Sequence, residues 1–373
     1  MQAPVLECEY NNQAMFEMTP MMEEVLDQPR ALADVRKYYT SPGAIPFSTL
    51  RRVVTHWPPT VVFTGMGSSL FAAYPAQAFL TSVGIRALVW ETAELLHHHL
   101  RILKPDTLLV IVSQSGETVE VTRLLEHLPK RVGVLGVVNV ESSTLGRRAN
   151  VLLPLLAGRQ KSVSTRTYTT SVAVLMYLAF AIARQRHRPL TETLVQAIEA
   201  EEQVLEHRKE VTDATAEYFG LPPYLSLMSR GADLSTAYQG ALMFKEVVRM
   251  AAEPMSAAQF RHGPIEIINP AHRYIIIARR GPAQRPSRRA GPGKFLERLA
   301  EDIRAHGGRV LLLTDIAGKR EPSMRVLKVE PLGLGLGTLV DSVYIQLLVH
   351  ELALRAGLEP GKFWIAQDVT REE

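Results

Sequence analysis

The segment from Val110 to Thr118 constrains the fold more than any other part of the sequence. An apolar run over residues 108–112 predicts a buried strand, and residues with hydroxyl groups or no side chain follow it directly. From residue 119 to 128 the apolar residues recur with helical spacing. A strand, a turn of small residues and a helix start leave backbone N–H groups free at the positive end of a helix dipole, which favours an anion there.

Hydroxyl groups surround the same turn, on Ser113, Ser115 and Thr118. Residues 113–118 contain no Lys or Arg, so the turn differs from the nucleotide-binding P-loop, in which a lysine reaches the outer phosphates. Hydroxyl groups together with backbone amides suit one small phosphate monoester. We therefore expect a phosphorylated small molecule to bind at this turn.

Strand-like runs alternate with helix-like runs along the chain, which predicts an α/β protein with mostly parallel sheets. The predicted strands are 60–64, 87–90, 108–112 and 132–139 in a first series and 224–228, 274–278 and 309–314 in a second. Gly67 and Gly116 are 49 residues apart, and Gly231 and Gly281 are 50 apart. This spacing indicates an internal repeat with ligands at the carboxyl ends of the strands. Arginines replace the small residues of the first turn in the second half, so we expect the second phosphate site to be lost or altered, and residues 279–294 to form an exposed loop.

A length of 373 residues favours two domains over one. We expect an N-terminal helical arm over 1–50, with its helix around 21–39, a first α/β domain over 51–215, a second over 216–356 and a C-terminal tail over 357–373. The apolar run 169–183 is too short to cross a bilayer and predicts a buried helix.

The composition excludes several function classes. The single Cys8 allows no intramolecular disulfide and fits a reducing compartment. The net charge of +4 is modest and does not indicate nucleic-acid binding. Glu7 and Glu9 precede any apolar run, which is atypical of a signal peptide. We expect a cytoplasmic protein with no membrane and no nucleic-acid partner.

Two further turns carry hydroxyl groups. Residues 65–70 form a partial glycine pattern after a strand, but Leu70 stands where a dinucleotide-binding loop has its third glycine, which disfavours a nicotinamide cofactor. Ser68 and Ser69 fit better as hydroxyl groups that face the same ligand as Ser115. Ser164 lies in a third such turn, before the apolar helix. Each turn alone is more often a helix cap, and three at one sheet edge would suit a phosphorylated polyol.

The second half offers acid–base groups. A helix predicted over 235–252 carries Glu246 in an apolar setting, and Glu253, seven residues on, is expected to share its face. His262 stands directly before a Gly-Pro turn. Either residue alone is more often structural or solvated, so the residues by themselves leave these roles open. For His97, His98 and His99 we expect a solvated helix end rather than a metal site, because consecutive helical residues point in different directions.

Four motifs together make the chain resemble the double sugar-isomerase (SIS) domain family, and within it the isomerase half of glutamine–fructose-6-phosphate amidotransferase. They are residues 113–118, 164–166, 239–246 and 261–264. The resemblance covers roughly residues 18 to 370 and implies two flavodoxin-like three-layer α/β/α SIS domains in a homodimer, with no metal and no organic cofactor.

The resemblance also implies a site for a sugar 6-phosphate. The ligand would bind Ser68, Ser69, Ser113, Gln114, Ser115, Thr118, Ser164 and Gln367. Glu246 would move a proton between C1 and C2 of the sugar, and His262, reaching in from the neighbouring subunit, would assist ring opening. A carboxyl group in an apolar setting suits this work, because burial raises its pKa toward neutrality.

Departures from the family pattern narrow the expected reaction. The family's lysine before the Lys-Glu pair is Met243 here, and its imine-forming C-terminal lysine aligns with Gln367, so a Schiff base at that position is excluded. No glutaminase part precedes the isomerase part, so we expect no glutamine-derived ammonia from this chain. These departures favour an isomerase for a hexose 6-phosphate, with an amino sugar preferred and ammonia release as an option. The alternatives are a phosphosugar sensor without turnover, an Amadori-product deglycase, and a nicotinamide-dependent oxidoreductase.

Overall fold

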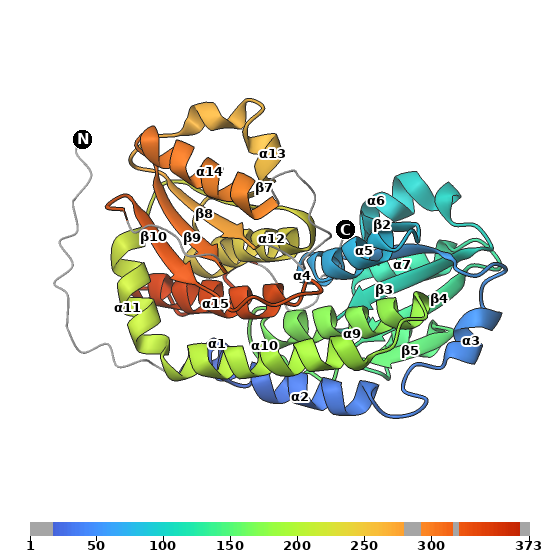
Figure 1. The fold of residues 1–373 in the computed structure, drawn as a ribbon. Helices are drawn as coiled ribbons and strands as arrows, with labels where there is room; N and C mark the ends of the chain where they lie inside the picture. The colour runs from blue at the N-terminus through green and yellow to red at the C-terminus, as the bar shows by residue number, and fades with distance from the viewer. Residues whose placement is uncertain (1–17, 280–291, 316–320, 366–373) are drawn as a thin grey trace.

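The protein is described here from a computed structural model, which covers residues 18–279, 292–315 and 321–365 (Figure 1). Gln367 therefore lies outside the described residues, as do residues 280–291 of the predicted exposed loop.

Two five-stranded parallel sheets organise the chain. The first contains β1 (Thr60–Gly65), β2 (Ala87–Glu91), β3 (Thr107–Ser113), β4 (Gly133–Val138) and β5 (Val151–Pro154), in the order β2-β1-β3-β4-β5. The second contains β6 (Leu225–Ser229), β7 (Ala252–Ser256), β8 (Arg273–Ala278), β9 (Arg309–Thr314) and β10 (Met324–Lys328), in the order β10-β9-β8-β6-β7. The two orders are the same when read from opposite ends. The flavodoxin-like class and the internal repeat are thus confirmed.

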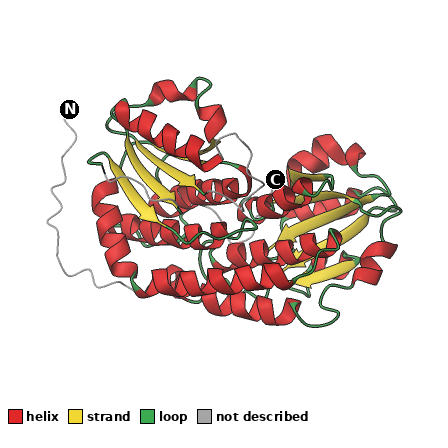
Figure 2. Cartoon of the chain, viewed as in Figure 1, coloured by secondary structure: helices red, strands yellow, loops and turns green. Residues whose placement is uncertain are grey.

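Helices cover both faces of each sheet (Figure 2). The longer helices and single turns are α1 (Pro20–Leu26), α2 (Gln28–Tyr39), α3 (Phe47–Arg52), α4 (Ser68–Phe71), α5 (Tyr74–Ser82), α6 (Thr92–Glu94), α7 (Val119–His127), α8 (Thr144–Arg148), α9 (Arg166–Ile182), α10 (Arg188–Glu206), α11 (Arg208–Phe219), α12 (Leu234–Met243), α13 (Ala257–Phe260), α14 (Pro292–Ala305) and α15 (Gly337–Arg355). Short 3₁₀ or π turns are η1 (Leu95–His99), η2 (Leu100–Ile102), η3 (Gly231–Asp233), η4 (Phe244–Val248) and η5 (Pro264–Ile267).

A helical layer shared by both sheets forms the largest core. Strand residues alternate between two faces, so Leu108 and Val110 of β3 enter this shared core while Leu109 enters an outer core beneath η1 and α7. In the second sheet Ile275 enters the same shared core, and Ile276 packs under α14. Helices α2, α9, α10, α12 and α15 lie in the shared layer, and α10 contacts both α2 and α15 (Figure 1). The predicted apolar helix is α9, and it is buried.

The prediction of one helix over residues 235–252 is wrong at its C-terminal end. Helix α12 stops at Met243, the π turn η4 follows, and Arg249 takes a left-handed conformation with φ of 57° that ends the helical run. Residues 252–256 then form β7, whose Ala252 pairs in register with Leu225. Glu253 therefore lies on a strand and shares no helix face with Glu246. Strands β5 and β10 were also not predicted.

The prediction of an exposed loop over residues 279–294 is wrong at the two ends that the structure describes, because one end is buried and the other is helical. Arg279 is buried and pairs with Asp341 through two hydrogen bonds of 2.8 Å. Lys294 lies within α14. The domain division at residues 215 and 216 stays a prediction, and α11 runs across it. In the part of the chain that the structure describes, no helix combines the length and apolarity needed to cross a membrane.

Candidate functional site

The hydroxyl-rich turns meet where β1 and β3 lie side by side. Strands β2 and β4 flank them on opposite sides, so the strand order reverses between β1 and β3. In open α/β sheets this reversal opens a crevice at the carboxyl ends of the two strands. The 65–69 turn leaves β1 and the 113–118 turn leaves β3, so both stand at this crevice.

Local hydrogen bonds build the 113–118 turn. The Ser113 hydroxyl accepts from the Gly116 N–H at 3.0 Å, and the Ser115 hydroxyl accepts from the Glu117 N–H at 3.2 Å. Gly116 has a φ of +67°, and a Cβ there would lie 2.1 Å from the Ser143 Oγ. Only glycine fits this position, for both backbone and steric reasons.

The segment that connects β4 to α8, together with the start of α8, holds the 113–118 turn from outside. The Asn139 N–H donates to the Gln114 carbonyl at 3.2 Å, and the Leu145 N–H donates to the Gly116 carbonyl at 3.1 Å. Glu117 accepts from the Thr144 N–H at 2.6 Å. These contacts occupy the Gln114 and Gly116 carbonyls and the Glu117 carboxylate, and so fix the turn to the connection that follows β4.

Thr118 is the residue of this turn that most directly indicates a ligand. It is the N-cap of α7 but makes no side-chain cap bond, and its buried Oγ1 has no hydrogen-bond partner among the described residues. Buried hydroxyl groups are nearly always paired, so an unpaired one at a helix N-terminus fits an anionic partner.

The 65–69 turn approaches β3 closely. A Cβ on Gly65 would lie 2.9 Å from the Val112 carbonyl oxygen, so glycine allows the two strand ends to come together. Ser68 is buried and Ser69 half-buried at the start of α4. Both serines thus begin the helix that follows β1, next to the end of β3, and their facing the same ligand as Ser115 stays a prediction.

A cleft of about 560 Å³ opens beside the 113–118 turn, over the ends of β4 and β5. Gln114 and Ser115 form one side, and residues 158–162 form another. Ser164, just beyond, bonds through its hydroxyl to the Thr167 hydroxyl at 2.6 Å.

The second half contributes helix α12 to the same region. The Ser235 hydroxyl donates to the Phe71 carbonyl at 2.6 Å, and Gln239 Nε2 donates to the Ser164 carbonyl at 3.0 Å. A Cβ on Gly67 would lie 3.5 Å from Leu242. Since Gln239, Leu242 and Glu246 are spaced three and four residues apart, they follow one side of this helical segment.

Glu246 lies on the π turn η4 and is partly buried. Burial raises the pKa of Glu246 to about 7. A carboxyl group with this pKa can both take and return a proton near neutrality. Single π turns within helices occur often at functional positions.

The other residues singled out in the sequence lie outside the 113–118 turn. His262 is exposed, in the turn between α13 and η5. Met243 is buried in the shared core. The three consecutive histidines lie at the end of η1, with His99 4.0 Å from the Trp90 ring. Among the described residues, no group of three or more His, Cys, Asp or Glu side chains could hold a metal ion.

The corresponding sheet edge of the second half is filled by its own side chains. Arg279 follows β8 as Gln114 follows β3, and besides Asp341 it donates to the Gly337 carbonyl at 3.3 Å. Burial raises the pKa of the nearby Asp233 to about 7, against the opposing effect of Arg279. A buried, paired arginine thus begins the turn that corresponds to residues 113–118 of the first half.

Sequence reasoning missed Gln239 as a site residue. Its spacing from Glu246 was a signal that could have identified it, because residues seven apart share a helix side. The contacts of Lys161 with Glu23 and Glu24, which hold the 158–165 loop, were missed as well, since these partners lie more than a hundred residues away.

Comparisons with known proteins agree with this architecture. Residues 55–183 match the family described as "SIS domain". The glutamine–fructose-6-phosphate aminotransferase (isomerizing) of Neisseria meningitidis is 27% identical over 360 residues, which is 92% of this chain and 56% of that protein. The chain spans about half the length of the curated relatives it matches.

Solved structures share the fold over nearly the whole chain. The C-terminal domain of glucosamine-fructose-6-phosphate aminotransferase from Francisella tularensis has a TM-score of 0.82 at 20% identity, covering 92% of this chain and 98% of that one. A glucosamine-6-phosphate deaminase from Thermotoga maritima has a TM-score of 0.71 at 19% identity, covering 94% and 99%.

Proposed function

The chain belongs to the double sugar-isomerase (SIS) domain family, and on that premise we propose that it isomerises a hexose 6-phosphate, with an amino sugar such as glucosamine 6-phosphate as the preferred substrate. One observation carries the proposal most directly. The buried Thr118 hydroxyl at the N-terminus of α7 has no hydrogen-bond partner among the described residues, which supports an anionic ligand there. The contacts of α12, the helix that leads to Glu246, with Ser164 and the 65–69 turn agree with it.

The 6-phosphate would bind the Ser113, Ser115 and Thr118 hydroxyl groups and the N–H groups at the start of α7, with Ser68 and Ser69 on its other side. Fixing the phosphate also fixes C1 and C2 at the far end of the open-chain sugar. Such positioning can contribute several kcal/mol to catalysis. Ser164 and Gln114 would contact the sugar between these two ends.

Glu246 would act as the base. Its carboxylate takes the proton from C2 of the open-chain aminoaldose, the electron pair of that C–H bond forms the C1=C2 double bond, and the C1=O π electrons move to O1, which takes a proton from water. The carboxyl group then returns its proton to C1 while the C2 amine loses one proton to water, which leaves a C1 hydroxyl group and a ketimine at C2. Water then hydrolyses the ketimine to fructose 6-phosphate and ammonia. With a 2-hydroxyl substrate the same proton transfer interconverts aldose and ketose.

His262 would assist ring opening by moving a proton to the ring oxygen. Its exposure supports a role toward a second copy of the chain, and we propose a homodimer in which it completes the neighbouring site. Met243, an apolar buried residue, supplies no amine beside Glu246, and we propose that Gln367 contacts the sugar by hydrogen bonding.

The test is a panel of sugar 6-phosphates incubated with purified protein: glucosamine, fructose, glucose, galactosamine and fructosamine-type adducts. NMR would follow the sugars, and an enzymatic assay would follow ammonia. Fructose 6-phosphate and ammonia from glucosamine 6-phosphate would support a deaminating isomerase, and release of an amine from a fructosamine adduct would indicate a deglycase. Ligand shifts without any product would overturn the enzymatic proposal in favour of a phosphosugar sensor.

A further inference from the structure

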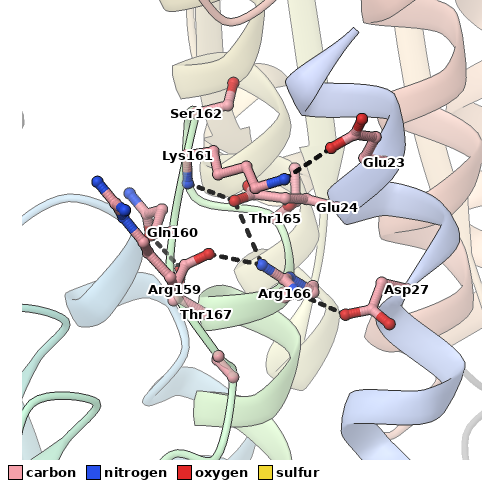
Figure 3. A network of polar contacts seen from close by, with 12 residues as sticks. Glu23, Glu24, Asp27, Arg159, Gln160, Lys161, Ser162, Thr165, Arg166 and Thr167 are labelled. Carbon is pink, nitrogen blue, oxygen red and sulfur yellow. Dashed lines mark hydrogen bonds and ion pairs between the residues drawn. The ribbon is translucent and has the colours of Figure 1, made fainter. Parts of the chain in front are cut away.

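Arg166, in the first turn of α9, lies at the centre of a largely buried ionic network (Figure 3). Its side chain is 10% exposed, and that of its partner Glu24 is 3% exposed. One guanidinium nitrogen donates to Asp27. The other donates to Glu24 at 3.4 Å and to the Arg159 carbonyl at 2.7 Å. The arginine thus joins the N-terminal helices to the loop that precedes α9.

Acidic residues of α1 also form hydrogen bonds and an ion pair with that loop, residues 158–165. Glu24 accepts from the backbone N–H of Lys161 and from the Thr165 hydroxyl, the latter at 3.3 Å. Lys161 also pairs through Nζ with Glu23 at 2.8 Å. Two positions of the 158–165 loop, Lys161 and Thr165, are therefore tied to a helix that lies far away in the sequence.

The 158–165 loop faces the candidate site on its other side. Gln160 and Ser162 help to line the cleft that Gln114 and Ser115 border. The Ser164 carbonyl accepts the hydrogen bond from Gln239, on the helical segment that leads to Glu246. The loop stands between the ionic network and the residues proposed to hold the sugar.

The chemistry of the network favours positioning over simple stabilisation. Buried ion pairs add little net stability compared with apolar residues of similar size, because desolvating the charges offsets their attraction. They do impose directional geometry, and a guanidinium can hold two carboxylates and a carbonyl at defined angles. Such a network suits a loop whose exact placement matters.

We propose that Arg166, with Glu24 and Asp27, positions the 158–165 loop against the sugar portion of the substrate, so that these three are positioning residues for the reaction. This inference rests on the proposed function. It assigns the N-terminal helix α1 a role in substrate affinity, separate from phosphate binding by the 113–118 turn.

Two variants test it, Glu24→Gln and Arg166→Lys. Glu24→Gln removes one charge and keeps the shape and an acceptor oxygen, and Arg166→Lys keeps the charge and loses the fork of donors. The matched control is Glu192→Gln, which makes the same substitution in the exposed Arg188–Glu192 pair. For each protein, KM and kcat for the hexose 6-phosphate, the inhibition constant of inorganic phosphate, and Tm are measured.

In Glu24→Gln we expect KM to rise about tenfold, while the inhibition constant of inorganic phosphate stays within twofold of wild type. Arg166→Lys should raise KM by a smaller factor, and Glu192→Gln should change neither constant. A lower Tm with unchanged KM in both network variants would overturn the proposal and leave a purely structural network. If the wild-type protein neither binds nor converts any sugar phosphate, the proposed function itself fails, and this inference with it.

Discussion

Gln239 on α12 donates a hydrogen bond of 3.0 Å to the carbonyl of Ser164, which joins a helix of the second half to the loop of the first half that precedes α9. The Oε1 atom of Gln239 is buried without a partner among the described residues. Because Glu246 follows seven residues later, the same helical segment connects the proposed base to that loop. The site is therefore composed from both halves of the repeat.

Replacing Glu246 with Gln should lower turnover by a factor of about 10² to 10⁴, the usual range for loss of a general base. The amide keeps the size of the side chain, so the dissociation constant of the sugar phosphate should stay within about threefold of wild type. Steady-state kinetics and isothermal titration calorimetry measure the two effects. Glu253→Gln is the control, since Glu253 lies on β7 and accepts from the Tyr224 hydroxyl at 2.6 Å. Equal activity in Glu246→Gln and wild type would exclude Glu246 as the base.

The pH profile should report the pKa of Glu246. Burial raises that pKa to about 7, so the carboxylate that accepts the proton becomes scarce below neutrality. We expect log kcat/KM to fall with a slope of about one per pH unit below pH 7, because kcat/KM follows ionisation of the free enzyme. A profile that stays flat from pH 5 to 8 would contradict a base with this pKa.

Thr118→Val should separate ligand binding from folding. Valine keeps the shape and removes a hydroxyl that has no partner among the described residues, so Tm should hold or rise slightly. Binding of the sugar phosphate should weaken by about tenfold, equal to one charge-assisted hydrogen bond of roughly 1.5 kcal/mol. Ser113→Ala is the contrasting variant, because it breaks the bond to the Gly116 N–H and should lower Tm. Unchanged affinity in Thr118→Val would argue against phosphate at this turn.

Glu201 on α10 should make stability depend on pH. The side chain is fully buried, its carboxyl oxygens have no hydrogen-bond partner among the described residues, and burial raises its pKa to about 8. The folded state therefore binds the proton more tightly than the unfolded state, so this stabilisation is complete below about pH 4.5 and is lost as pH rises to about 8. Glu201→Met should raise Tm by several degrees more at pH 8 than at pH 5. Thermal melts at both pH values measure this difference, with substitution of the exposed Glu199 by Met as the control. An equal change in Tm at pH 5 and pH 8 would show that the pKa of Glu201 is not raised.

Local patterns explain why much of the site could be predicted. The 113–118 turn is held by bonds from Ser113 and Ser115 to N–H groups two or three residues away, so its shape is encoded in six consecutive residues. The strands around it are apolar runs whose alternate residues enter two cores. The glycine at position 116 is required by backbone conformation and by contact with Ser143.

Other features depended on partners that no local pattern identifies. The helix predicted over 235–252 would include Ala252, and in-register pairing with β6 makes residues 252–256 a strand instead. Arg279 belongs to an arginine-rich segment that resembles a solvated loop, and Asp341, 62 residues on, makes its burial possible.

The sequence by itself determined the α/β class, the repeat and the turns with their hydroxyl groups, because these depend on residues within a few positions of one another. Only the tertiary structure decided which charges are buried and paired. The pairing of Arg166 with Asp27 joins residues 139 apart, and the apolar surroundings of Glu246 come from the packing of α12 and η4 in the shared core. Burial and electrostatic pairing are set by elements that meet only after folding, so the pKa values and positioning contacts of the site follow from the three-dimensional arrangement.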